Sequence, residues 1–249
     1  WLKGLITGHR LDALLVMLEQ KDKEAMTVLV SDPEMLQYAG PLAPVMPRNA
    51  AQMVSRLTRI APPDHKIGVV LKPCEARAVV ELVKLKQANL ENIVIIGIDC
   101  PGTVPVSVYK NERIAIPEES QLRTACRVCE YPSPIYADLI IGTAGLTQSH
   151  GIILETTGKK GEELLSGSPL SEAGEQELTA RNKAIEEIRT RHIKARDELF
   201  EHLNNEIYGL DNLVNVLSAC TGCHNCRIMC PICYCRECFF DSPTFDREA

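Results

Sequence analysis

The last fifth of the chain carries a cysteine motif that strongly limits how this region can fold. Seven of the eleven cysteines fall between Cys220 and Cys238. The first four follow the spacing C-x2-C-x2-C-x3-C and are followed by a proline: Cys220, Cys223, Cys226 and Cys230. This spacing is typical of iron–sulfur proteins, in which three thiolates bind one cluster and the fourth reaches another cluster or a partner. The motif therefore predicts an electron carrier.

Two other uses of cysteine fit this segment less well. Zinc sites usually present their cysteines in pairs that longer loops separate, whereas here three ligands follow at consecutive two-residue gaps. Eleven cysteines in 249 residues is also far below the density of small secreted disulfide scaffolds, and no segment resembles a secretory signal. We therefore expect metal-bound thiols in the cytoplasm, with a zinc-stabilised interaction module as an alternative.

Three further thiols, on Cys233, Cys235 and Cys238, exceed what one cluster can use. In one interpretation, one of them completes the ligand set of the first three cysteines of the motif. In the other, the segment folds around two clusters, and Cys230 shares the second cluster with these three. The sequence leaves both arrangements open.

Composition excludes several classes of function. The net charge of -6 and a pI near 5.6 argue against a nucleic-acid-binding protein, as does an aromatic content of only 4%. No apolar run reaches the roughly 18 residues that a membrane span requires, so we expect no direct span. Because the chain begins at Trp1 rather than methionine, we expect further residues upstream.

Short apolar runs alternate with helical patterns through the first two-thirds of the chain. The alternation predicts an α/β fold with a mainly parallel sheet and flanking helices. The strands are expected at residues 25–31, 66–71, 92–98, 138–142 and 151–155, and two of the helices at 50–60 and 75–87.

A charged helical segment follows, and this change in composition predicts that the chain has three regions. These are an α/β domain over residues 1–160, a helical connector over 161–210 and a small ferredoxin-like segment over 211–249. The connector should hold a long amphipathic helix that begins near Ser171 and is either a packing helix that carries the cysteine-rich segment or a helix that docks a partner. We expect His192 to be a packing residue. The apolar stripe comprises Leu178, Ile185, Ile188, Ala195, Leu199 and Leu203.

A second set of cysteines is predicted at the sheet. Cys74 and Cys100 each follow a predicted strand, and the carboxyl ends of parallel strands meet at the edge where open α/β sheets bind ligands. Cys126 and Cys129 form a C-x2-C pair just before the next strand. We expect these four cysteines to bind a second 4Fe–4S cluster, with ordinary buried cysteines as the alternative.

Three motifs in this order resemble the beta subunits of coenzyme F420-dependent hydrogenases and dehydrogenases. The motifs are Lys-Pro-Cys-Glu at 72–75, Ile-Gly-Ile-Asp-Cys at 96–100, and Cys-Arg-Val-Cys at 126–129 with Ala-Asp-Leu-Ile-Ile-Gly-Thr-Ala-Gly at 137–145. The resemblance covers approximately residues 28–145. It implies an iron–sulfur flavoprotein, with the cluster on Cys74, Cys100, Cys126 and Cys129.

The resemblance also implies FAD near the same sheet edge. The turn from Gly142 to Gly145 is the candidate for a close approach of the cofactor to the main chain, although a plain turn after a strand accounts for the glycines equally well. Lys72 and Arg77 are candidates to hold an anionic cofactor, or are simply solvated.

The leading functional hypothesis is an electron-transfer subunit with two or three 4Fe–4S clusters and FAD. It would work with larger redox subunits of an anaerobic complex of the formate dehydrogenase, hydrogenase or heterodisulfide reductase type. No acid–base or nucleophilic constellation is evident, so we predict no catalytic residues. The alternatives are a self-contained FAD enzyme that reduces coenzyme F420 or a nicotinamide, and the zinc module.

Overall fold

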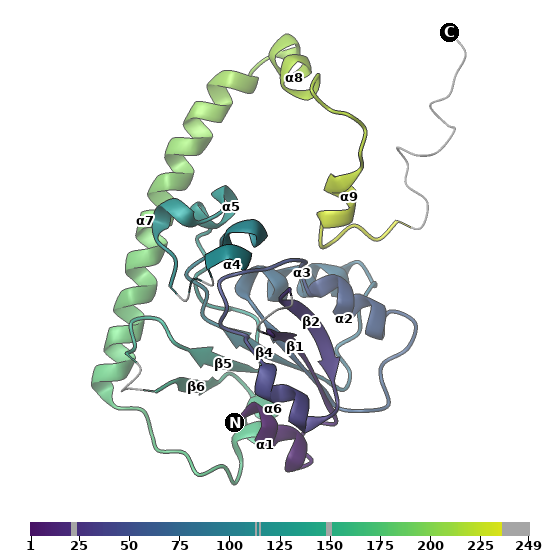
Figure 1. Cartoon of the computed structure of the whole chain (residues 1–249), viewed down its shortest axis with the longest axis vertical. Helices are drawn as coiled ribbons and strands as arrows, with labels where there is room; N and C mark the ends of the chain where they lie inside the picture. Colours follow the sequence, from purple (N-terminus) through teal and green to yellow (C-terminus); the bar gives the residue numbers. More distant parts are fainter. Residues whose placement is uncertain (21–23, 113, 115, 148–150, 236–249) are drawn as a thin grey trace.

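The computed structural model describes residues 1–20, 24–112, 114, 116–147 and 151–235, and it is an α/β structure with a long helix on one side (Figure 1). The strands are β1 (Ala13–Leu18), β2 (Met26–Val30), β3 (Ile67–Leu71), β4 (Ile93–Ile98), β5 (Leu139–Gly142) and β6 (Ile153–Thr156). The helices are α1 (Leu2–Thr7), η1 (Pro33–Tyr38), α2 (Ala51–Thr58), α3 (Pro73–Lys84), α4 (Val106–Glu112), η2 (Glu119–Gln121), α5 (Thr124–Arg127), α6 (Lys159–Leu165), α7 (Glu175–Ile207), α8 (Leu210–Leu217) and α9 (Asn225–Met229).

The six strands form one sheet in the order β2-β1-β3-β4-β5-β6. β1, β3, β4 and β5 run parallel, and the edge strands β2 and β6 pair antiparallel with their neighbours. The predicted fold class, a mainly parallel α/β sheet, is confirmed. Five of these strands match predicted ranges. β1 was not predicted, because its six residues are all buried and a short apolar run fits a buried helix as well as a buried strand.

Alternation along the strands explains why helices cover both faces of the sheet. In β4, Ile93 and Ile95 pack with the helices α2 and α3, whereas Val94 and Ile96 pack on the opposite face with α1 and α6. Successive strand residues point to opposite faces, so a strand that is apolar at every position needs cover on both. The helices thus leave the strand ends as the place where polar residues and cysteines gather.

Helix α3 begins earlier than predicted. Its first residue is Pro73, and the Glu75 carboxylate accepts hydrogen bonds from the backbone N–H of Lys72 at 2.8 Å and of Ala50 at 2.9 Å. Proline suits the first helical position because its missing N–H would have no helical partner there. Cys74 therefore lies in the first turn of α3, rather than before the helix.

The long helix α7 extends over 33 residues and begins at Glu175, four residues later than predicted. It runs along one side of the α/β domain and leads into α8 and α9 (Figure 1). Its two buried residues are polar, Arg181 and His192, while Leu178 on the predicted apolar stripe is 42% exposed. Polar contacts therefore anchor α7 on the α/β domain.

Within the described ranges, the helices are all too short or too polar to cross a bilayer.

Candidate functional site

Two cysteines meet at the carboxyl edge of the sheet. β3 and β4 are parallel neighbours, paired from Ile67 with Ile93 to Leu71 with Gly97. Cys74 follows β3 in the first turn of α3, and Cys100 follows β4 by two residues. The parallel pairing thus carries both thiols to one edge of the sheet.

The C-x2-C pair reaches the same place from another part of the chain. Cys126 lies in the short helix α5, and the Cys129 N–H donates to the Cys126 carbonyl at 3.1 Å, which turns the chain and brings the two thiols to one side. The Cys100 N–H donates to the Pro132 carbonyl at 2.7 Å. This bond ties the end of β4 to the segment that follows Cys129.

All four thiols line one cavity of about 160 Å³, which we call the cysteine cavity. The other lining residues are Met46, Asn49, Pro73, Gly102, Thr103, Arg123, Ala125, Tyr131 and His192. The part of the chain that the structure describes has no group of three His, Cys, Asp or Glu side chains closed around a single metal ion. The shared cavity is what supports the predicted ligand set of Cys74, Cys100, Cys126 and Cys129.

Burial makes three of these thiols, those of Cys74, Cys100 and Cys129, weaker acids while they remain unligated. Burial raises the pKa of Cys100 to about 11, against the opposing effects of the nearby Lys72 charge and a hydrogen bond from the Gly102 backbone. Burial also raises the pKa of Cys74, and the Glu75 charge adds to this effect. It raises the pKa of Cys129 as well, against a backbone hydrogen bond from Tyr131. A bound cation would be needed to hold these three cysteines as thiolates at neutral pH.

Basic side chains surround the cavity. Lys72, which the sequence left either solvated or cofactor-binding, is 4% exposed and donates weakly to the Pro41 carbonyl at 3.4 Å. Arg123 lines the cavity, and its Nε is buried without a hydrogen-bond partner. An orphaned cationic N–H beside four thiols fits an anionic group such as a thiolate-bound iron–sulfur cluster, because buried polar groups without partners cost about 1–3 kcal/mol. The residues present therefore fit the predicted cluster.

A buried ion pair fixes the loop that carries Cys100. Arg181 of α7 binds the Asp99 carboxylate through two hydrogen bonds of 2.8 Å, and Asp99 also accepts from Ser133 at 2.8 Å and from the Thr143 N–H at 2.9 Å. Arg181 also reaches Glu155 at 2.9 Å. Since the Asp99 and Arg181 side chains are only 1% and 7% exposed, the pair holds the cysteine loop to α7.

A second set of contacts from α7 holds the C-x2-C loop. His192 is buried, and its Nδ1 lies 2.8 Å from the Cys129 carbonyl oxygen, so that nitrogen carries the proton and donates. The other ring nitrogen, Nε2, lies 3.3 Å from Glu119 without making a hydrogen bond. One turn further on, Arg196 pairs with Glu130 at 2.5 Å. His192 thus packs against the C-x2-C loop and supports it through Nδ1.

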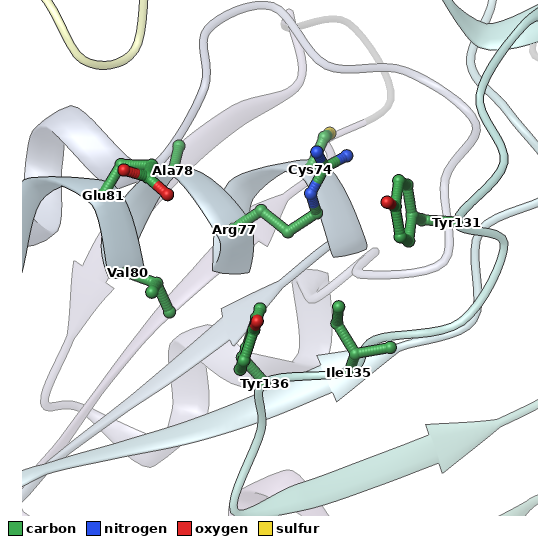
Figure 2. Close-up of a pocket in the computed structure, with 8 residues that line it drawn as sticks. All are labelled: Cys74, Arg77, Ala78, Val80, Glu81, Tyr131, Ile135 and Tyr136. Carbon is green, nitrogen blue, oxygen red and sulfur yellow. The ribbon is translucent and has the colours of Figure 1, made fainter.

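A larger pocket of about 420 Å³ lies beside the cysteine cavity, and we call it the tyrosine pocket. Arg77 lies over the Tyr131 ring, with its guanidinium carbon 3.9 Å from the ring centroid, and Tyr136 lines the same space (Figure 2). Cys74 and Tyr131 border both the pocket and the cavity. The remaining lining residues are Ala78, Val80, Glu81 and Ile135.

Gly142 and Gly145, the predicted site of a close cofactor approach, lie against α7. A side chain at Gly142 would collide with Arg181, and one at Gly145 would meet the Ala180 carbonyl oxygen at 2.6 Å. The packing of α7 therefore accounts for both glycines. Their role in binding a flavin stays a prediction.

The chain is similar in sequence to two known proteins, both beta subunits of formate dehydrogenases. It is 28% identical to the F420-dependent formate dehydrogenase subunit beta of Methanocaldococcus jannaschii, over 99% of this chain and 74% of that protein. It is 27% identical to the F420-dependent formate dehydrogenase 1 subunit beta of Methanococcus maripaludis, over 70% of this chain and 56% of that protein. No family model matches. The chain is a relative of these beta subunits.

The resemblance predicted from the three motifs is thereby confirmed, and it extends beyond the region that the motifs cover. The alignment with the Methanocaldococcus beta subunit includes the cysteine-rich tail as well as the α/β domain. The names of these relatives indicate a subunit of an oxidoreductase complex.

The predicted ligands of the tail lie apart from the cysteine cavity. Cys220, Cys223, Cys226 and Cys235 are exposed, and Cys230 and Cys233 are partly buried, whereas Cys238 lies outside the described residues. A backbone hydrogen bond from Asn225 lowers the pKa of Cys223. Gln52 of α2 donates to the Cys230 carbonyl at 2.7 Å and to the Ile228 carbonyl at 3.4 Å. The tail thus touches α2, whose first turn is tied to Glu75 of α3.

Sequence reasoning missed the residues that hold the cysteine loops in place. Asp99, Arg181 and Arg123 were not singled out, and the contact of His192 with the C-x2-C loop was not foreseen. A signal was available in the spacing of Arg181 and His192, which are eleven residues, or about three turns, apart and so share one face of α7. Two polar residues on the apolar face of a helix indicate polar partners on the surface that the helix covers.

Proposed function

We propose that this chain is an electron-transfer subunit of an anaerobic formate dehydrogenase-type complex and carries two or three 4Fe–4S clusters. The observation that carries the proposal is the cysteine cavity, because Cys74, Cys100, Cys126 and Cys129 come from three separate segments and line one cavity. Isolated structural cysteines have no reason to gather in this way. Relatives named as formate dehydrogenase beta subunits support the same assignment.

In the cysteine cavity, the four thiolates would hold one cluster, and the cluster, when bound, would accept and release single electrons. The chain contributes the surroundings. Lys72 and Arg123 balance negative charge, while the Asp99–Arg181 pair and His192 keep the two cysteine loops at fixed positions. Helix α7 covers this side of the cavity and limits the access of water.

In the tail, Cys220, Cys223 and Cys226 would hold a further cluster, whose fourth ligand is one of the remaining tail cysteines. The alternative with two tail clusters assigns Cys230, Cys233, Cys235 and Cys238 to the second. The hydrogen bonds from Gln52 support a route for electrons from the tail to the α/β domain. They join α9 to α2, and the Ala50 N–H at the start of α2 donates to Glu75, next to Cys74.

The tyrosine pocket is the place in the α/β domain where we propose that FAD binds with its ring system. Its volume of about 420 Å³ falls within the range of about 300–1,000 Å³ for cofactor pockets, and its two tyrosine rings suit a flat molecule. The lining holds one cation, Arg77, and one carboxylate, Glu81. Arg77 would contact the cofactor in the pocket, and Lys72 would add positive charge on the cavity side. Gly142 and Gly145 would then act through the packing of α7.

We further propose a larger redox subunit as the partner and the cytoplasm as the location. The chain supplies electron carriers but no recognisable acid–base or nucleophilic site, so substrate chemistry would take place in another polypeptide. The names of the relatives, each a subunit of a formate dehydrogenase, support a complex of this kind.

Anaerobic purification with counts of iron, acid-labile sulfide and flavin tests the proposal. We expect at least seven irons and seven sulfides per chain, since two clusters contain about eight of each. We also expect flavin in the holoprotein and a stable complex with a larger subunit after native purification. Only four irons at full occupancy would mean that one of the two proposed cluster sites holds no cluster. Zinc in place of iron would favour the interaction module.

The tyrosine pocket also favours a second candidate function. With a flavin bound beside the cysteine cavity, the chain could itself reduce coenzyme F420 or a nicotinamide. Turnover by the isolated chain with a physiological donor and acceptor would favour this self-contained enzyme, whereas turnover only within the complex would favour the electron-transfer subunit.

A further inference from the structure

Thr103, Arg123 and Cys126 form one hydrogen-bonded unit at the wall of the cysteine cavity. The Arg123 N–H donates to the Thr103 carbonyl at 3.0 Å, and the Arg123 carbonyl accepts from the Cys126 N–H at 2.8 Å. Thr103 is buried, with 2% exposure. Main-chain bonds therefore fix the positions of all three side chains relative to one another.

Two side chains of this unit converge on one sulfur. Thr103 Oγ1 lies 3.2 Å from Cys126 Sγ, and Arg123 Nη2 lies 3.8 Å from the same sulfur. A thiolate bound to metal has no proton and can only accept, so both groups would donate to it. Among the described side chains, these donors distinguish Cys126 from the other three cysteines, of which Cys74 instead has the carboxylate of Glu75 beside it.

The second observation is independent of this contact. Arg123 lines the cysteine cavity, and its Nε is buried without a hydrogen-bond partner. Thr103 Oγ1 and Arg123 Nη2 already lie against the Cys126 sulfur. Arg123 Nε still needs an acceptor, and the described residues do not provide one. Inorganic sulfide or a neighbouring thiolate, both rich in negative charge, would supply that acceptor.

We propose that Arg123, held by Thr103, donates hydrogen bonds to the cluster at its Cys126 corner and raises the reduction potential of the cluster. This inference rests on the proposed function. Reduction adds one electron and thus one negative charge, so a fixed cation and two donors at one corner stabilise the reduced form more than the oxidised form. Hydrogen bonds to sulfur are among the factors that set cluster potentials.

The test is a potentiometric titration of the full-length holoprotein, with dithionite as reductant and electron paramagnetic resonance as the readout. Arg123→Leu should lower the potential by at least about 59 mV, which is a tenfold change in the one-electron equilibrium. Arg123→Lys keeps the charge but loses the planar fork, so its shift should be smaller and in the same direction. Thr103→Val, which removes only a hydroxyl, should also shift the potential downward.

Arg127→Leu is the matched control, because Arg127 ends the short helix α5 that Arg123 caps, but it is exposed and its guanidinium donates to Thr124 Oγ1 at 3.4 Å. It removes an equal charge and should leave the potential unchanged. An Arg123→Leu protein with a full cluster and an unshifted potential overturns the inference. If that variant fails to hold the cluster, Arg123→Lys decides: an unchanged potential overturns the inference and a lowered one supports it.

The proposed function has a separate readout. Iron analysis of the wild-type chain and of Cys74→Ser asks whether the cavity holds a cluster at all. Loss of about four irons in Cys74→Ser together with an unshifted potential in the Arg123 variants would overturn the role of Arg123 and leave the proposed function standing. Unchanged iron in Cys74→Ser would overturn both.

Discussion

The two groups of cysteines differ in what holds them. Cys74, Cys100, Cys126 and Cys129 line a cavity at the end of a buried parallel sheet, with loops that hydrogen bonds and a buried ion pair keep in place. In the tail, four of the six described cysteines are exposed, and α8 presents Leu213 and Leu217 to solvent at 43% and 59% exposure. In the first region the fold sets the positions of the ligands, whereas in the second the metal would have to set the fold.

Single cysteine substitutions should give the largest effect. Cys74→Ser and Cys129→Ser should each abolish the same cluster, with the loss of about four irons, because their thiols share one cavity. Cys223→Ser should abolish a different signal and leave the first intact. Electron paramagnetic resonance with iron analysis checks this, and circular dichroism serves as the control for folding. Different signals lost on Cys74→Ser and Cys129→Ser would show that the cavity does not hold one cluster.

The second-largest effect should come from removal of iron, which should unfold the tail but not the α/β domain. A chelator under anaerobic conditions should increase hydrogen exchange over residues 210–235 to nearly the rate of an unfolded chain, because the tail has little buried apolar surface of its own. Amides of β3 and β4 should keep their protection. Hydrogen exchange with mass spectrometry gives both readings in one experiment. A tail that stays protected without iron would mean that its own packing sets its fold.

Loss of the ion pair behind the cysteine cavity should destabilise the α/β domain. Arg181→Met leaves the Asp99 carboxylate buried without its cation, which costs about 3–5 kcal/mol in comparable buried pairs. Denaturant unfolding of the α/β domain measures the change. Lys183→Ala is the control, because its ion pair with Glu187 is exposed and should contribute less than about 1 kcal/mol. Equal stability of the two variants would contradict the assignment of α7 as the anchor.

The smallest effect concerns pH in the iron-free protein. The folded protein binds the Cys100 proton more tightly than the unfolded chain does, since burial raises the pKa of this thiol from 9.0 to about 11. The contribution of this thiol to the free energy of unfolding is complete below pH 9. It is lost as the pH rises toward 11, by about 3 kcal/mol at most. Anaerobic thermal unfolding with reductant measures this loss. Cys100→Ser should make the profile shallower but not flat, because Cys74 and Cys129 keep their raised pKa values. A Cys100→Ser profile identical to that of the wild type would refute the prediction.

The fold was largely readable from the sequence, because apolar runs and helical periodicity follow directly from burial on two faces. β1 was the exception, since six consecutive apolar residues carry no periodicity that distinguishes a strand from a helix. The gathering of Cys74 and Cys100 at one edge was also predictable, because it follows from the order of parallel strands.

The surroundings of the cysteines could not be predicted in the same way. The contacts of Asp99 with Arg181 and of Cys129 with His192 join residues that lie far apart in the sequence. They depend on where α7 packs on the domain, and a periodic pattern on one helix does not say which surface it will meet. Local patterns thus predict the elements, while long-range polar pairs require the assembled structure.

The cysteines of the cavity and the helix that covers them are synthesised at different times. Cys74, Cys100, Cys126 and Cys129 are synthesised before the helix that contacts their loops, and at about 5–20 residues per second His192 follows Cys129 by on the order of 3–13 s. During that interval the nascent domain has its cysteines in place but lacks one wall of the cavity. If the cavity holds a cluster, as proposed, iron and sulfide would enter most easily before α7 docks.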